Sequence, residues 1–94
     1  MNEPLKPNQV KALVVTAVAT GSVLFTSHAL RELAKDRMTP DDATRVLRGG
    51  AASHGEFENG SWRYQMRSGS VVVVIEFVMF TPVKTLVITA WKRK

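Results

Sequence analysis

Two arginines and one isolated carboxylate in the second half of the chain have the chemistry needed for metal-independent RNA cleavage. Such cleavage requires a base for the ribose 2′-hydroxyl proton, an acid for the leaving oxygen and cations for the charge on phosphorus. Arg63 and Arg67 suit the cation role, because a guanidinium binds phosphate oxygens through two parallel hydrogen bonds. Glu76 stands alone within an apolar run and is a candidate base.

The two histidines and two aromatic residues add further candidates. His28 and His54 are alternatives to Glu76 as the base, and Trp91 or Tyr64 can stack on a nucleotide base. Each has a structural alternative. His28 stands where it can cap or pack a helix start, His54 lies in a weak strand, and Tyr64 falls at a position expected to face the core.

The strands that would position these side chains follow from alternation and turn residues. Asn59-Gly60 predicts a type I′ hairpin, and Ser68-Gly69 predicts a second tight turn. If Ser68-Gly69 is a two-residue loop, Met66 pairs with Val71, and the pairs Tyr64–Val73 and Trp62–Ile75 follow. The predicted strands cover residues 52–58, 61–67, 71–80 and 84–91.

This register divides the side chains between two faces. The apolar face is expected to carry the core, with Phe77, Leu86, Ile88 and Ala90 continuing it. The opposite face is polar, with valines between its polar residues: Arg63, Gln65, Arg67, Ser70, Val72, Val74, Glu76, Val78, Val87, Thr89 and Trp91. A solvated sheet face, with Glu76 in a cross-strand ion pair, explains the same pattern without any chemistry.

The first half of the chain predicts three helices. Pro7 begins an amphipathic helix that ends at Gly21, followed by a short extended piece at residues 23–25. Thr26 or Ser27 caps a second helix, which is expected to bury Ala29, Leu30, Leu33 and Ala34. Thr39-Pro40-Asp41-Asp42 begins a third, which Gly49-Gly50 ends. The first helix is also a candidate cover for the polar sheet face.

Composition limits the classes of protein that fit. The 94 residues predict one domain over 1–94, with a flexible start at 1–6. No cysteine occurs, which excludes disulfides and thiolate metal sites, and the two distant histidines argue against a metal enzyme. We expect no cofactor, no membrane span and a cytoplasmic location. Thirteen Lys and Arg against eight Asp and Glu give a formal charge of +5, which suits a polyanionic partner.

The segment Thr26-Ser27-His28-Ala29-Leu30-Arg31, with a second helix ending in glycine and a closing sheet, resembles a known arrangement. It is similar to a bacterial family of small domains of unknown function that open with Thr-x-His-Ala-x-x-Arg, and Arg31 stands one position earlier than the arginine of that opening. That family is similar in layout to the RelE, BrnT and MqsR toxins, which cleave RNA and are neutralised by an antitoxin. The ending Ala90-Trp91-Lys92 resembles that of MqsR, where an aromatic residue precedes a catalytic lysine. The resemblance therefore implies a catalytic Lys92 and a structural His28.

We therefore expect an α+β domain in which two helices cover one face of a three- or four-stranded antiparallel sheet, with an additional N-terminal helix. The predicted function is a toxin-like endoribonuclease with RNA and an antitoxin as partners. Catalytic candidates are Lys92, Glu76, His28 and Tyr64. Substrate-binding candidates are Arg63, Arg67, Arg31 and Trp91, with Arg31 equally suited to an ion pair. The alternatives are a non-catalytic RNA- or protein-binding module and a homodimer formed through Val72, Val74, Val87 and Trp91.

Overall fold

The computed structural model describes residues 2–93, and Met1 and Lys94 lie outside the described residues. Over residues 2–93 the chain is an α+β domain with three helices and a six-stranded sheet, which confirms the predicted class. The sheet is larger than the predicted three or four strands, because the extended piece at 23–25 joins it as β1 and the strand predicted over 52–58 is divided into β2 and β3. The elements are α1 (Pro7–Thr20), β1 (Val23–Phe25), α2 (Ser27–Lys35), α3 (Pro40–Gly49), β2 (Ala51–Ala52), β3 (Glu56–Glu58), β4 (Ser61–Ser68), β5 (Val71–Phe80) and β6 (Val83–Lys92).

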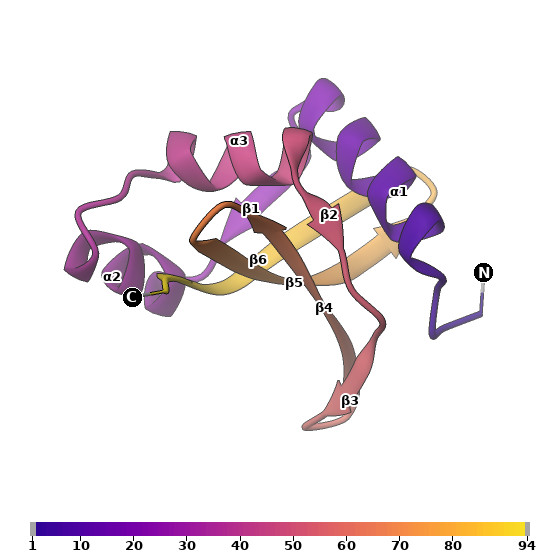
Figure 1. The fold of residues 1–94 in the computed structure, drawn as a ribbon. Coiled ribbons are helices and arrows are strands. Elements are labelled where there is room, and N and C mark those ends of the chain that lie inside the picture. Colours follow the sequence, from indigo (N-terminus) through magenta and orange to yellow (C-terminus); the bar gives the residue numbers. More distant parts are fainter. Residues whose placement is uncertain (1, 94) are drawn as a thin grey trace.

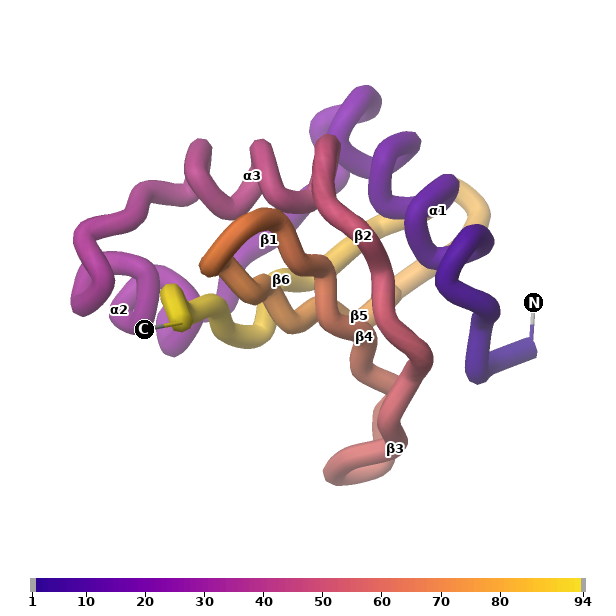
Figure 2. Tube along the Cα trace, viewed as in Figure 1, coloured from indigo at the N-terminus to yellow at the C-terminus, as the bar shows by residue number. Residues whose placement is uncertain are grey.

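The sheet has the order β1-β6-β5-β4-β2, and β3 pairs with β4 beyond β2 (Figure 1). All pairings are antiparallel except that of β1 with β6, which is parallel. The helices α1 and α3 pack against each other and over the same side of the sheet, while α2 packs against β6 (Figures 1 and 2). Consequently α1 does not cover the polar sheet face. None of the helices within residues 2–93 covers it, and we call it the helix-free face.

The two hairpins show how well turn residues predict register. Asn59 and Gly60 have φ values of 50° and 83°, as a type I′ turn requires, so this prediction is confirmed. The second loop is Gly69-Ser70 rather than Ser68-Gly69, with Gly69 at φ 58°. Ser68 therefore pairs with Val71, and every expected pair of β4 with β5 is shifted by two residues. A shift of two leaves each side chain on its expected face.

A β-bulge in β6 overturns part of the expected face assignment. Val74 pairs with Thr89 but Ile75 pairs with Val87, so Ile88 is an extra residue without a partner. An extra residue reverses the alternation that follows it. Val87 is therefore fully buried in the core, whereas Leu86 and Ile88, which were expected there, are only half-buried.

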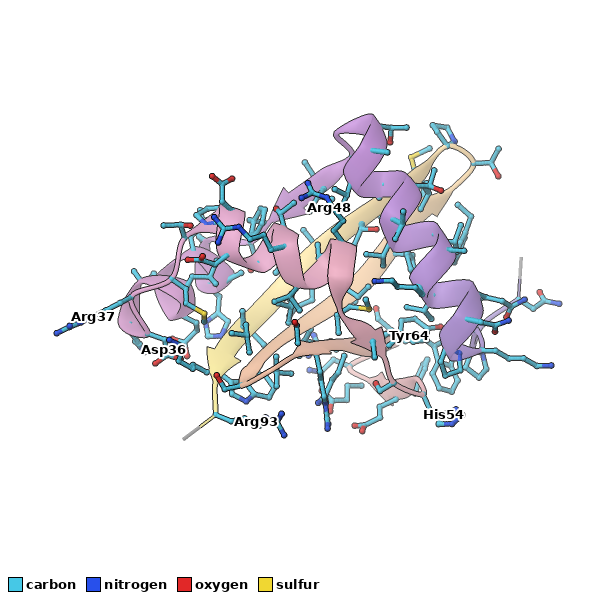
Figure 3. All side chains as sticks on the ribbon, turned by 45° about the horizontal axis from the view of Figure 1, so that its top comes forward. Asp36, Arg37, Arg48, His54, Tyr64 and Arg93 are labelled. Atoms are coloured by element: carbon cyan, nitrogen blue, oxygen red, sulfur yellow. The ribbon has the colours of Figure 1, made fainter. Side chains whose placement is uncertain are left out.

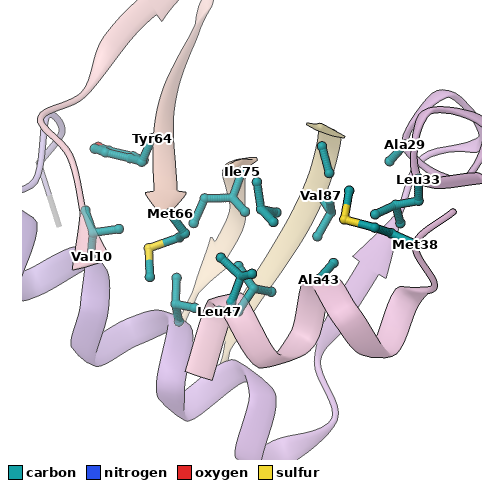
Figure 4. Close-up of a cluster of buried hydrophobic side chains, with 14 of the residues drawn as sticks. Val10, Ala29, Leu33, Met38, Ala43, Leu47, Tyr64, Met66, Ile75 and Val87 are labelled. Atoms are coloured by element: carbon teal, nitrogen blue, oxygen red, sulfur yellow. The ribbon is translucent and has the colours of Figure 1, made fainter. Parts of the chain in front are cut away.

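The core lies between the sheet and the helices (Figure 4). Val10 and Val14 of α1 contribute to it, and Leu47 of α3 is fully buried beside them. The expected burial of Leu30 and Ala34 in α2 is wrong, because this short helix turns only one narrow stripe inward. Leu30 is 44% exposed, and Ala34 is exposed as well. Within residues 2–93 no helix combines the length and apolar character that crossing a membrane requires.

Capping hydrogen bonds explain where α2 and α3 begin, and the close approach of α3 to the sheet explains where α3 ends. Thr26 Oγ1 accepts a hydrogen bond from Ala29 N and donates one to the Ile88 carbonyl, so it fixes the start of α2 to β6. Thr39 and Asp42 form a reciprocal capping box at the start of α3. Gly50 ends α3 where a Cβ atom would lie 2.5 Å from the Arg67 carbonyl oxygen, so only glycine fits between helix and sheet.

The N-terminal segment contacts the sheet through Tyr64. The Tyr64 hydroxyl accepts a hydrogen bond from Leu5 N at 3.0 Å and donates one to Glu3 Oε2 at 2.8 Å. Leu5 itself is only 3% exposed and joins the core. Within the start that is predicted to be flexible, a buried leucine and a buried hydroxyl therefore connect Glu3 and Leu5 to the sheet.

Candidate functional site

The helix-free face brings two of the predicted site residues into direct contact. Arg63 Nε donates to Glu76 Oε2 at 3.0 Å, and its Nη1 donates to Glu58 Oε2 at 3.3 Å. The exposed fractions of the Arg63 and Glu76 side chains are 25% and 18%, so the pair is partly shielded from water. The guanidinium is thus already occupied by two carboxylates, and a phosphate would have to displace one of them.

The other arginine on this face is bound to a neighbour on its own strand. Arg67 Nε and Nη2 both donate to Gln65 Oε1, at 3.1 Å and 2.6 Å. This places the Arg67 guanidinium along β4, where it remains exposed. Arg63 and Arg67 therefore share a face, as the alternation predicts, but each has a different partner.

A groove of about 190 Å³ lies on the helix-free face, and we call it the acidic groove. Its lining contains two carboxylates, Glu56 and Glu58, and one guanidinium, Arg63. Glu76 adds a third carboxylate through its bond to Arg63. The groove is lined by His54, Glu56, Glu58, Arg63, Gln65, Val74, Thr89 and Trp91. Its negative balance disfavours a phosphate ligand.

A second groove of about 360 Å³ lies where the end of the sheet meets the connection between α2 and α3, and we call it the basic groove. It contains the cations Arg37, Arg45 and Lys92 against a single carboxylate, Asp42. Its apolar floor consists of Met38, Val46 and Val71, and Ser68 completes the lining. The balance of charge here suits an anion.

Local structure explains how the cations reach the basic groove. The backbone N–H of Lys92 donates to Asp36 Oδ2 at 2.8 Å, which ties the end of β6 to the end of α2. Lys92 pairs with Val71, so both side chains point to the helix-covered side, whereas Trp91 points into the acidic groove. Adjacent residues of one strand therefore line different grooves.

Arg37 occupies an unusual backbone position at the end of α2. Its φ is 57°, in the left-handed region that favours glycine. Met38 N donates to Leu33 O at 2.8 Å and Arg37 N to Ala34 O at 3.1 Å, the pattern of a Schellman cap. Figure 3 shows Arg37 extending away from the molecule, far from His54. No glycine marked this turn in the sequence, so Arg37 and Arg45 were missed as site residues.

The carboxylate of the basic groove has a structural task. Asp42 Oδ2 accepts a hydrogen bond from Thr39 N at 2.8 Å, and Oδ1 lies 3.5 Å from Arg45 Nη1. The bonds from Thr39 lower the pKa of Asp42 below its ordinary value. It is therefore ionised at neutral pH and poorly suited to act as a base.

Three other predicted residues do not join either groove. Tyr64 is fully buried, and burial is the main cause that raises its pKa to about 12, so it keeps its proton at neutral pH. His28 and Arg31 are exposed on α2 and line neither groove. The tie between helix start and sheet, which the resemblance implies for His28, is made by Thr26 instead.

Comparison of the chain with protein-family models, with curated proteins and with solved structures finds no match. The functional argument therefore rests on the two grooves. Within residues 2–93 no three His, Cys, Asp or Glu side chains gather closely enough to hold a metal ion.

Proposed function

We propose that this chain binds RNA, with phosphates of the strand held in the basic groove. The observation that carries the proposal is that Arg37, Arg45 and Lys92 line one groove in which Asp42 is the single lining carboxylate. Asp36 lies beside this groove and accepts a hydrogen bond from Lys92 N. Cations of this kind bind a nucleic-acid backbone and release its counterions. The apolar floor formed by Met38 and Val46 suits the sugar or base of the same nucleotide.

The backbone at Arg37 supports a role for its side chain. A residue other than glycine in the left-handed region costs about 1 kcal/mol, and glycine is the common residue at this position of a Schellman cap. An arginine at φ 57° therefore stands where stability alone would favour glycine. Strained positions of this kind cluster at functional sites.

The geometry favours binding over cleavage. Of the four predicted catalytic residues, only Lys92 lines the basic groove. Tyr64 is buried, Glu76 is bonded to Arg63, and His28 lies on α2 away from both grooves. A lysine alone can stabilise charge on phosphorus, but cleavage also needs a base that is free to accept the 2′-hydroxyl proton.

A toxin-like endoribonuclease remains the second candidate, because the lysine that the resemblance implies as catalytic does line the basic groove. In that case a partner protein of the antitoxin type would cover the same groove. Its segment would carry acidic side chains to match Arg37, Arg45 and Lys92.

A single set of measurements separates the two candidates. A labelled single-stranded RNA is titrated with the protein in EDTA at several salt concentrations, and the RNA is then examined for cleavage. Three phosphate contacts predict a slope of log K against log salt of about −2, and Lys92→Ala reduces its magnitude by about 0.7. Intact RNA with this slope supports the binding module. Cleavage that is lost in Lys92→Ala establishes the ribonuclease instead, and neither binding nor cleavage rejects both.

A further inference from the structure

The helix-free face carries a groove whose charge is opposite to that of the whole chain. We propose that this face docks a protein partner through an arginine-bearing segment, with one guanidinium seated in the acidic groove. The occupant is identified by charge complementarity: the carboxylates of Glu56, Glu58 and Glu76 lie on or beside this groove, while the chain as a whole has a formal charge of +5. This inference is independent of RNA binding.

The chain itself shows which chemical group these carboxylates accept. The Arg63 guanidinium lies between Glu58 and Glu76, at 3.3 Å and 3.0 Å. Glu56 also lines the groove, and among residues 2–93 no hydrogen bond or ion pair engages its carboxylate. One carboxylate is therefore available to a cation from outside the chain.

An aromatic wall makes arginine a better occupant than a simple ammonium. Trp91 lines the groove and is 37% exposed, and Val74, only 9% exposed, lies between Gln65 and Thr89 in the sheet. A guanidinium stacks on an indole face while its edge donates hydrogen bonds to carboxylates, and an ammonium lacks that planar geometry. The Gln65 and Thr89 side chains supply further polar contacts.

The valines that were expected to form a dimer surface on this face are mostly buried. The expected dimer surface depends on Val72, Val74 and Val87, but Val72 is 1% exposed and Val87 is in the core. Leu24 is 47% exposed on this face, where it pairs with Leu86 and Leu86 pairs with Glu76, but neither leucine lines the acidic groove. The groove itself combines carboxylates with Trp91, so a basic segment is the better match for it.

The test is a titration of the full chain with a fluorescein-labelled hexa-arginine peptide, followed by fluorescence anisotropy at low ionic strength. The net positive charge of the chain opposes general attraction of such a peptide, so binding reports a local acidic site. We expect Glu56→Gln and Trp91→Ala each to weaken binding about threefold, and the double variant about tenfold. A hexa-lysine peptide binds more weakly than hexa-arginine.

Each variant has a matched control. Glu32→Gln removes the same charge from α2, where Glu32 pairs with Lys35, and Lys92→Ala alters the neighbour of Trp91 that points to the other groove. Glu32→Gln should weaken hexa-arginine binding much less than Glu56→Gln does. Lys92→Ala should bind the peptide at least as well as the parent chain, because this substitution lowers the net positive charge. Circular dichroism confirms that all variants are folded. Absence of peptide binding, or equal weakening in Glu32→Gln and Glu56→Gln, overturns the proposal.

Discussion

The acidic and basic grooves lie close to the same strand end and have opposite electrostatic characters. Trp91 lines one and Lys92 the other, because successive side chains of β6 point to opposite faces. In the acidic groove the single arginine is held by two carboxylates, whereas in the basic groove three cations face one carboxylate that already caps a helix. An arginine on a predicted functional face therefore indicates an anion site only when the side chains that it already binds are known.

The largest expected effect comes from removing all three cations of the basic groove. Arg37→Gly combined with Arg45→Ala and Lys92→Ala should lower RNA affinity about 100-fold at 0.1 M salt, because three counterion-releasing contacts are lost. Titration of a labelled single strand by anisotropy measures this. A variant that neutralises Glu56, Glu58 and Glu76 provides the contrast and should not lose RNA affinity.

The second effect concerns stability rather than binding. Arg63→Ala leaves the half-buried Glu76 carboxylate without its cation and should lower the free energy of unfolding by about 2 kcal/mol, measured by urea denaturation. Replacing both partners, with Arg63→Met and Glu76→Leu, should recover most of the loss. If Arg63→Ala instead unfolds at the same urea concentration as the parent, the pair contributes nothing to the fold.

The third effect tests whether Tyr64 stabilises the fold without taking part in RNA binding. Tyr64→Phe removes the hydrogen bonds to Glu3 and Leu5 and should cost about 1.5 kcal/mol near neutral pH, with RNA affinity unchanged. Because the folded pKa is raised from 10.0 to about 12, the folded chain keeps a proton that the unfolded chain releases. The stabilisation is complete below pH 10 and is lost as pH rises toward 12.

Urea denaturation of the parent and Tyr64→Phe chains across this pH range tests the sign. The difference between their unfolding free energies should shrink above pH 10. A difference that grows with pH contradicts the burial of a neutral hydroxyl.

The smallest expected effect is on stability alone and comes from Thr85, which lines neither groove. The Thr85 hydroxyl is fully buried and has no hydrogen-bond partner among the described residues. Thr85→Val keeps the shape and removes the unsatisfied group, so we expect the free energy of unfolding to rise by about 1 kcal/mol. Thermal unfolding measures the gain. Thr85→Ser keeps the hydroxyl and should show no such gain, and a destabilised Thr85→Val would reveal a partner for that hydroxyl.

Features governed by local chemistry were predictable from the sequence. The capping box at Thr39 and the turn at Asn59-Gly60 depend on neighbouring residues, and both are confirmed. The predicted division of the β4 and β5 side chains between the two faces is correct despite the wrong register, because the register error was two residues. Val87 was misplaced because nothing in a run of apolar residues marks the extra residue Ile88.

The site was harder to predict because it depends on contacts between distant segments. A cross-strand ion pair of Glu76 was one of the alternatives that the sequence left open, and Arg63 makes this pair. The joint position of Arg37, Arg45 and Lys92 requires β6 to end beside the turn between α2 and α3. That turn has Arg37 in the left-handed backbone conformation, whereas a glycine at this position would have indicated the turn in the sequence.

The most direct test of the central claim compares the RNA affinities of Arg37→Gly and Arg63→Gln with that of the parent chain. Arg37→Gly places glycine at a left-handed position, so it should fold at least as stably as the parent while RNA affinity falls about fivefold at 0.1 M salt. Arg63→Gln should bind RNA as the parent does, provided that it is measured where circular dichroism shows it folded. A loss of affinity in Arg63→Gln with none in Arg37→Gly would place RNA on the helix-free face and contradict the account.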